Sequence, residues 1–239
     1  MPVLFTELMR LRRSLALWLV VAAPLSLAAL SFLILLDRPK PVSWQIFADG
    51  TAAIWAYLML PMAITALSVL LAQVEQAARG WDHLLALPGW RGRFFAAKVA
   101  ALALLAAAMS VLLVGATMLA GLAADAVRGG MILTGELPLP HLTWLVARMW
   151  AAGSLMALLQ LWVALRARSF VPPLVLGIGG TLVGVVTASA KQGVFVPWLL
   201  AVNMLSTPER ATMAMSVALG GTGLLLPLML MDLTTAERR

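Results

Sequence analysis

Few side chains that could carry chemistry occur in this 239-residue sequence, which has ten acidic residues, two histidines and no cysteine. The lack of cysteine excludes disulfides and thiolate metal sites, and His83 and His141 are too few for most zinc sites. No phosphate-binding G-x-x-x-x-G-K-[ST] motif, no H-E-x-x-H and no G-x-S-x-G is present. We therefore expect a chain that is not an enzyme, has no catalytic residue and binds no metal or cofactor itself.

Three polar side chains stand out because they lie within or beside long apolar runs: Arg148, Gln160 and Asn203. Arg148 would lie about 10 Å inside a membrane-spanning helix, at about 1.5 Å per residue. Its guanidinium could extend outward to the lipid headgroups. Alternatively, it could contact a substrate or another subunit, because charges inside membranes are costly and are commonly functional. Gln160 and Asn203 are weaker candidates for the same substrate path or interface.

The glycines of "GIGGTLVG", which include Gly177, Gly180 and Gly184, could be mistaken for a dinucleotide-binding loop. That loop needs a preceding strand, whereas these glycines lie inside an apolar run. Small residues four positions apart allow two membrane helices to approach closely. The spacing therefore predicts helix packing.

A polar stretch, "RGWDHLLALPGWRGR" at residues 79–93, separates two strongly apolar runs. It can form a short helix that offers Leu84, Leu85 and Leu87 to a partner before Pro88 ends it. The alternative is a positively charged turn that only fixes the orientation of the chain in the membrane. Arg91, Arg93 and Lys98 are expected to begin the next span at the lipid surface.

The elements that position these residues follow from composition: 62% of residues are hydrophobic and 11% are charged. Soluble domains are usually less than about half apolar and about a quarter charged, so most of this chain should face lipid. Runs of roughly 20 apolar residues predict membrane-spanning helices. Six such spans are predicted, at about 14–36, 51–73, 95–122, 142–165, 170–190 and 211–231. None contains Asp or Glu, and Arg148 is the one charge well inside a span.

The 17 Lys and Arg residues indicate the orientation of the spans. With the N-terminus in the cytoplasm, eleven of them fall on inner segments and five on outer segments. Both termini are then cytoplasmic, and residues 74–93 form the longest cytoplasmic loop. Residues 1–13 are amphipathic and predict an interfacial helix, although they could simply extend the first span. The Pro-interrupted segment within 191–210 predicts a hairpin or interfacial segment, and residues 1–239 form a single transmembrane domain.

Several motifs, taken together in order, resemble those of ABC-2 type transporter permeases, in the branch of bacitracin-resistance and lantibiotic-immunity permeases. The family's N-terminal "E-x-x-K-x-[RK]-R-S" is similar to Glu7-Leu-Met-Arg-Leu-Arg-Arg-Ser14. Its loop after the second span is similar to Glu75, Trp81, Leu84-Leu-Ala-Leu-Pro88, Arg91 and Phe94-Phe-Ala-Ala-Lys98. The start of its fifth span and a later "PW" are similar to Ser169-Phe-Val-Pro-Pro-Leu174 and Pro197-Trp198. The sequence departs from the pattern at Gly89-Trp90, Pro172 and Leu199.

The resemblance implies a type V exporter-like transmembrane domain that pairs with a second permease chain, the same or homologous. It also implies two cytoplasmic ABC ATPase subunits, which bind the ATP and Mg. The loop after the second span would be the coupling helix held by the ATPase. Its force-carrying residues would be Glu75, Arg79, Trp81, Leu84, Leu85, Leu87 and Arg91. The substrate would be an antimicrobial peptide or another amphipathic molecule, exported across a bacterial cytoplasmic membrane.

Two other functions remain possible on the sequence alone. A non-transporting anchor or sensor subunit could use the same loop to dock a cytoplasmic complex. A secondary transporter is disfavoured because the predicted spans lack the acidic residues that usually couple transport to ions. Nucleic acid is not expected as a partner.

Overall fold

The computed structural model describes residues 14–77, 91–167 and 169–235 and is almost entirely helical there. The α-helices are α2 (Leu15–Leu36), α3 (Trp44–Ile54), α4 (Leu60–Ala77), α6 (Arg91–Val127), α7 (Leu139–Ala152), α8 (Ser154–Arg166), α9 (Val171–Thr187) and α10 (Pro208–Thr235). A π-helical turn, η1 (Trp55–Met59), joins α3 to α4. Three 3-10 helices follow α9: η2 (Lys191–Phe195), η3 (Pro197–Leu199) and η4 (Val202–Leu205). The predicted interfacial helix at residues 1–13 lies outside the described residues.

The helices are long and apolar enough to make this a multi-pass membrane protein. Four continuous helical segments of the described chain meet the length and hydropathy of a membrane span: Leu15–Leu36, Trp44–Gln73, Gly92–Val127 and Pro208–Thr235. The pair α7 and α8 forms a fifth if its two bent halves cross together. At 17 residues, α9 is about 26 Å long, less than the roughly 30 Å of a bilayer core. The prediction of several membrane helices is confirmed, and the count of six stays a prediction.

Four spans begin earlier than the sequence predicted, and the second and third differ most. The second was expected from residue 51, but its helix begins at Trp44, where the Ser43 hydroxyl accepts a hydrogen bond from the Ile46 amide. This serine cap starts an amphipathic helix that a purely apolar criterion misses. The third was expected at 95–122, but α6 runs from Arg91 to Val127.

A proline and a glycine break the regularity of two spans. Pro61 has no amide hydrogen to donate to the carbonyl of Tyr57, and its ring crowds that carbonyl. The preceding turn widens into η1, where the Leu60 amide donates to the carbonyl of Trp55, five residues back. At Gly153 the chain bends by 42° between α7 and α8. The bend divides the predicted span at 142–165 into two shorter helices.

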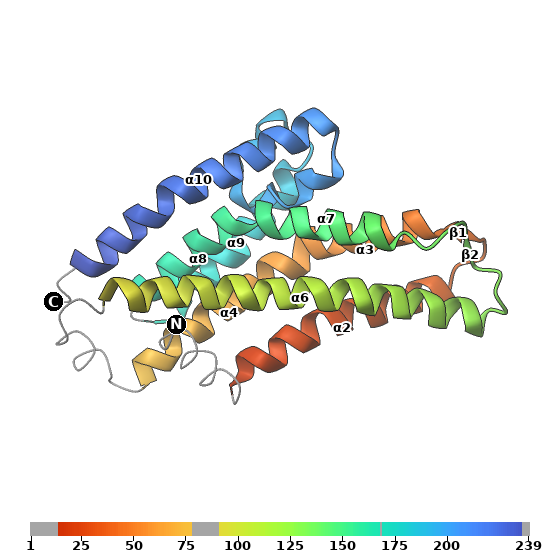
Figure 1. Ribbon diagram of the computed structural model, residues 1–239, viewed down its shortest axis with the longest axis horizontal. Coiled ribbons are helices and arrows are strands. Elements are labelled where there is room, and N and C mark those ends of the chain that lie inside the picture. The colour runs from red at the N-terminus through yellow and green to blue at the C-terminus, as the bar shows by residue number, and fades with distance from the viewer. Residues whose placement is uncertain (1–13, 78–90, 168, 236–239) are drawn as a thin grey trace.

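The helices form an elongated bundle in which α6 and α2 lie side by side (Figure 1). The last turns of α4, α8 and α10 and the first turn of α6 gather at one end of the bundle (Figure 1). The strands β1 (Val42–Ser43) and β2 (Leu133–Thr134) lie at the opposite end. This separation is what a membrane protein needs if its two ends face opposite sides of a bilayer. The cytoplasmic placement of the termini stays a prediction.

At the β end, two connections that are distant in sequence pair with each other. β1 and β2 are parallel, with Val42 opposite Leu133 and Ser43 opposite Thr134. The Asp125 carboxylate accepts hydrogen bonds from the amides of Ile132 and Leu133, both at 3.1 Å, and so shapes the turn into β2. The connections α2–α3 and α6–α7 are therefore joined to each other.

The segment expected to form a hairpin or interfacial element consists of η2, η3 and η4 and packs against the neighbouring helices. Trp198 and Leu200 are buried, and η3 lies against α9, α8 and η1. The Arg210 Nε donates to Asn203 Oδ1 at 2.7 Å, and its Nη2 donates to the carbonyl of Ala190 at 3.1 Å. These contacts fasten the segment to the end of α9, and much of it packs against the bundle. Its position relative to the lipid interface stays a prediction.

Candidate functional site

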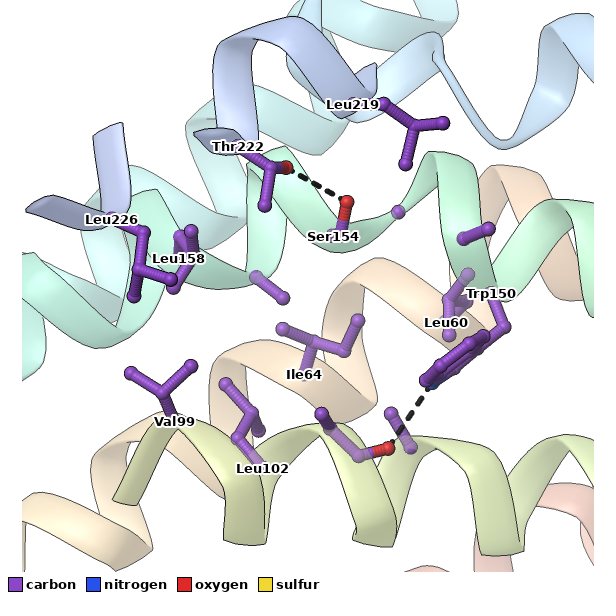
Figure 2. A pocket seen from close by; sticks show the side chains of 15 residues that line it. Leu60, Ile64, Val99, Leu102, Trp150, Ser154, Leu158, Leu219, Thr222 and Leu226 are labelled. Carbon is purple, nitrogen blue, oxygen red and sulfur yellow. Dashed lines mark hydrogen bonds between the residues drawn. The ribbon is translucent and has the colours of Figure 1, made fainter. Parts of the chain in front are cut away.

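A cavity of about 270 Å³ lies between α4, α6, α10 and the junction of α7 with α8 (Figure 2). We call it the inner cavity, because it lies nearer the end of the bundle where α6 begins. It lies within the helices that are long enough to span a membrane. Its lining consists of Leu60, Ile64, Val99, Leu102, Ala103, Ala106, Trp150, Ala151, Gly153, Ser154, Ala157, Leu158, Leu219, Thr222 and Leu226.

The bend at Gly153 positions one wall of the inner cavity. Directly after it, Ser154 Oγ lies 2.8 Å from Thr222 Oγ1, which ties α8 to α10 across the cavity (Figure 2). One of the two hydroxyls donates to the other, and no charged side chain is part of the lining. The site can accommodate an apolar group.

Trp150 closes the inner cavity on the side of β1 and β2. Its indole Nε1 donates a 3.1 Å hydrogen bond to the Ala103 carbonyl of α6 (Figure 2). Beyond the indole lies a second space of about 260 Å³, which we call the outer cavity. Its lining consists of Ala107, Ser110, Val111, Val114, Thr143, Val146, Ala147 and again Trp150.

The polar residues predicted for a substrate path line neither of these cavities. Arg148 lies half-exposed on α7 and makes no hydrogen bond or salt bridge with any residue that the structure describes. Gln160 is fully buried, where its Nε2 donates to the carbonyl of Pro173 at the start of α9, and its Oε1 has no partner among the described residues. Asn203 is engaged by Arg210. Whether any of the three contacts a substrate or a second subunit stays a prediction.

The glycines of α9 lie at close contacts between elements. A Cβ on Gly177 would overlap the side chain of Thr65 on α4, and one on Gly180 would overlap the indole of Trp198. Gly184 is less crowded, since a Cβ there would lie 3.4 Å from the Cβ of Trp198. These glycines allow α9 to approach α4 and η3 closely.

Most of the predicted coupling residues lie outside the described residues: Arg79, Trp81, Leu84, Leu85 and Leu87. Glu75 lies near the end of α4, and Arg91 is the first residue of α6. The structure therefore describes the two helices that flank residues 78–90. α4 ends and α6 begins at the same end of the bundle (Figure 1).

Lys98 is a correction to the sequence analysis, which placed it at the lipid surface. It is fully buried, and its Nζ donates a 2.9 Å hydrogen bond to the Leu71 carbonyl of α4. The same Nζ lies 4.9 Å from the centre of the Phe94 ring, a cation–π distance. Lys98 thus joins the two helices on either side of the predicted coupling loop. Its position one turn after Phe94 was visible in the sequence, but its partner was not.

A second polar junction that the sequence analysis missed joins α8 to α10 at the same end. Asp232 accepts hydrogen bonds from Arg166 Nη1 at 2.9 Å and from Trp162 Nε1 at 2.8 Å. In the ranges that the structure describes, no three His, Asp or Glu side chains gather as they would around a metal ion. The charged residues here connect helices.

Comparison with known proteins gives the family. The sequence matches the family model described as ABC-2 family transporter protein over residues 3–184, which covers α2 through most of α9. Searches of curated proteins and of solved structures gave no match. The matched range includes most of the lining of both cavities and the segment predicted to couple to an ATPase. The chain belongs to the ABC-2 transporter family and is a multi-pass permease component of an ABC transporter.

Proposed function

We propose that this permease exports an amphipathic molecule, such as an antimicrobial peptide, out of or away from a bacterial cytoplasmic membrane. It works as a pair of permease chains with two cytoplasmic ATPase subunits, which bind the ATP and Mg. The observation that carries the proposal is the family match over residues 3–184. The motif resemblance suggests the branch of bacitracin-resistance and lantibiotic-immunity permeases. The apolar lining of the inner cavity fits a substrate with an apolar part.

The placement of α4 and α6 supports the role of residues 74–93 as the coupling element. These residues connect two membrane helices that Lys98 joins near their ends. A displacement of the loop by the ATPase is therefore applied to both helices together. ATP binding would close the ATPases and shift the helices from an inward-facing to an outward-facing arrangement.

The partners can be tested by purifying the tagged chain from its native membrane in a mild detergent and identifying the proteins that accompany it. A stoichiometric ATPase with a phosphate-binding loop is expected, and a second permease sequence would distinguish a heterodimer from a homodimer. Substrate-stimulated ATP hydrolysis by that complex would separate an exporter from a non-transporting anchor or sensor. Failure to recover an ATPase, even after cross-linking with nucleotide present, would contradict the proposal.

Replacing Trp81 and Leu85 together by alanine should weaken ATPase association at least about tenfold, as expected when two interface anchors are truncated. Membrane insertion of the permease should be unchanged. The measurement is the amount of ATPase that copurifies, together with transport by the assembled complex. The matched control is Leu139→Ala with Trp144→Ala, an exposed pair on α7 near the opposite end of the bundle. Normal association and transport in the Trp81/Leu85 variant would rule out this loop as the coupling element.

A further inference from the structure

The inner and outer cavities follow one face of α6. Val99, Ala103 and Ala106 line the inner cavity, whereas Ser110 and Val114 line the outer cavity. Residues three or four positions apart lie on the same side of a helix, so this stripe runs along the helix axis through both spaces. The two cavities are therefore successive sections of one path along α6.

Trp150 is the side chain that separates the two sections. It contributes to both linings, and its indole is held across the path by the hydrogen bond to the Ala103 carbonyl. At about 270 and 260 Å³, each section is smaller than the roughly 300–1,000 Å³ of a typical small-molecule site. With the indole rotated away, the joined space falls within that range.

The chemistry of the lining identifies the occupant as hydrocarbon. A buried water needs two to four polar partners, and each hydroxyl along the path already takes part in a hydrogen bond. Ser154 pairs with Thr222, Ser110 donates to the Ala106 carbonyl, and Thr143 donates to the Leu139 carbonyl. No charged side chain lines either section. The helices around the path are long enough to span a membrane, so lipid tails are the molecules that surround it.

We propose that this path binds the acyl chain of a membrane lipid and that Trp150 is the gate between its inner and outer halves. The role of such a lipid in export rests on the proposed function, since the path would then take the apolar part of an exported amphiphile. Binding of the chain itself requires neither the ATPase nor transport.

The test uses the full chain in phospholipid nanodiscs without an ATPase. The probe is a phosphatidylcholine with a photoactivatable diazirine on one tail, and adducts are mapped by peptide mass spectrometry. In the wild-type protein, adducts are expected on residues 99–106 and 219–226. In Trp150→Ala they should extend to residues 107–114, whereas Trp150→Phe, which keeps a ring but loses the N–H, should give an intermediate pattern.

A plugging variant provides the decisive comparison. Ala157→Leu fills the inner cavity, and adducts at residues 99–106 should fall about tenfold, because added side-chain volume excludes the tail. Ala108→Leu is the matched control, because Ala108 is exposed on α6 and lines neither cavity, so labelling should not change. If Ala157→Leu does not elute as a folded protein, Ala103→Leu, which also fills the inner cavity, takes its place.

Labelling that is the same in Ala157→Leu and wild type, or that spreads evenly over the lipid-facing helices, would overturn the proposal. Labelling by a diazirine fatty acid but not by the phospholipid would overturn the membrane-lipid source. Labelling that stays within residues 99–106 in Trp150→Ala would overturn the gate. None of these outcomes depends on an ATPase partner, so failure here and failure of the proposed export function are separate results.

Discussion

Replacing Lys98 by methionine is expected to lower the thermal stability of the permease and to uncouple ATP hydrolysis from transport. The substitution removes the charged hydrogen bond from Nζ to the Leu71 carbonyl and the contact with the Phe94 ring. A hydrogen bond to a charged group contributes about 1.5–3 kcal/mol. For a chain of this length, that predicts a fall of about 3–12 °C in the apparent Tm. The Tm is measured in detergent, and coupling is measured as substrate moved per ATP hydrolysed by the reconstituted complex.

The matched control for this variant is Lys191→Met, which makes the same chemical change at an exposed lysine in η2. It should leave both the Tm and the coupling ratio unchanged. Lys98→Arg, which keeps the charge and a donor, should recover part of the coupling. A Lys98→Met protein with normal stability and a normal ratio of transport to hydrolysis would show that joining α4 to α6 is not required.

Replacing Gly177 by alanine should be nearly as damaging, although it adds a single methyl group. The new Cβ would overlap the Thr65 side chain, so α9 and α4 would have to separate. Overpacking of this kind costs about 1–3 kcal/mol, or about 2–12 °C in the apparent Tm at 2–4 °C per kcal/mol. The measurement is thermal unfolding of the purified protein, followed by loss of its monodisperse elution peak.

Two further variants separate the close contact from a general effect of alanine in α9. Gly179→Ala is the control, because a Cβ at Gly179 would meet no atom within 4 Å. Thr65→Ala removes Oγ1 and Cγ2, two of the three Thr65 atoms that the new Cβ would meet, so the double variant should recover part of the lost stability. Equal losses for Gly177→Ala and Gly179→Ala, or no rescue, would contradict the packing explanation.

The apolar segments were predictable from the sequence because lipid demands hydrophobicity over the whole length of a span. All six predicted segments are helical where the structure describes them, although their ends differ. The early start at Trp44 was missed because α3 contains Gln45 and Asp49, which lower its hydropathy. The signal that could have found it is Ser43, a residue type that commonly caps helices. The break at Gly153 also had a local signal, since glycine is a weak helix former.

The cavities and the buried lysine were not predictable, because they depend on which helices become neighbours. Lys98 was expected at the membrane surface, where isolated lysines usually lie. Its burial follows from the position of the Leu71 carbonyl, 27 residues earlier in the chain. Likewise, nothing near Trp150 in the sequence indicates that its indole would reach α6, 47 residues away. The predicted coupling residues between 78 and 90 lie outside the described residues and stay a prediction.

The pairing of β1 with β2 has a mechanical consequence. The ladder, together with the hydrogen bond from Arg128 to the Arg38 carbonyl, connects the turn after α2 to the turn after α6. Because α2 and α6 also pack along each other, the helix pairs α2–α3 and α6–α7 behave as one rigid unit at that end. A motion that widened the bundle between them would first have to break backbone pairing. Any opening at that end therefore occurs between these four helices and their neighbours, and not between α2–α3 and α6–α7. This limits the number of possible movements.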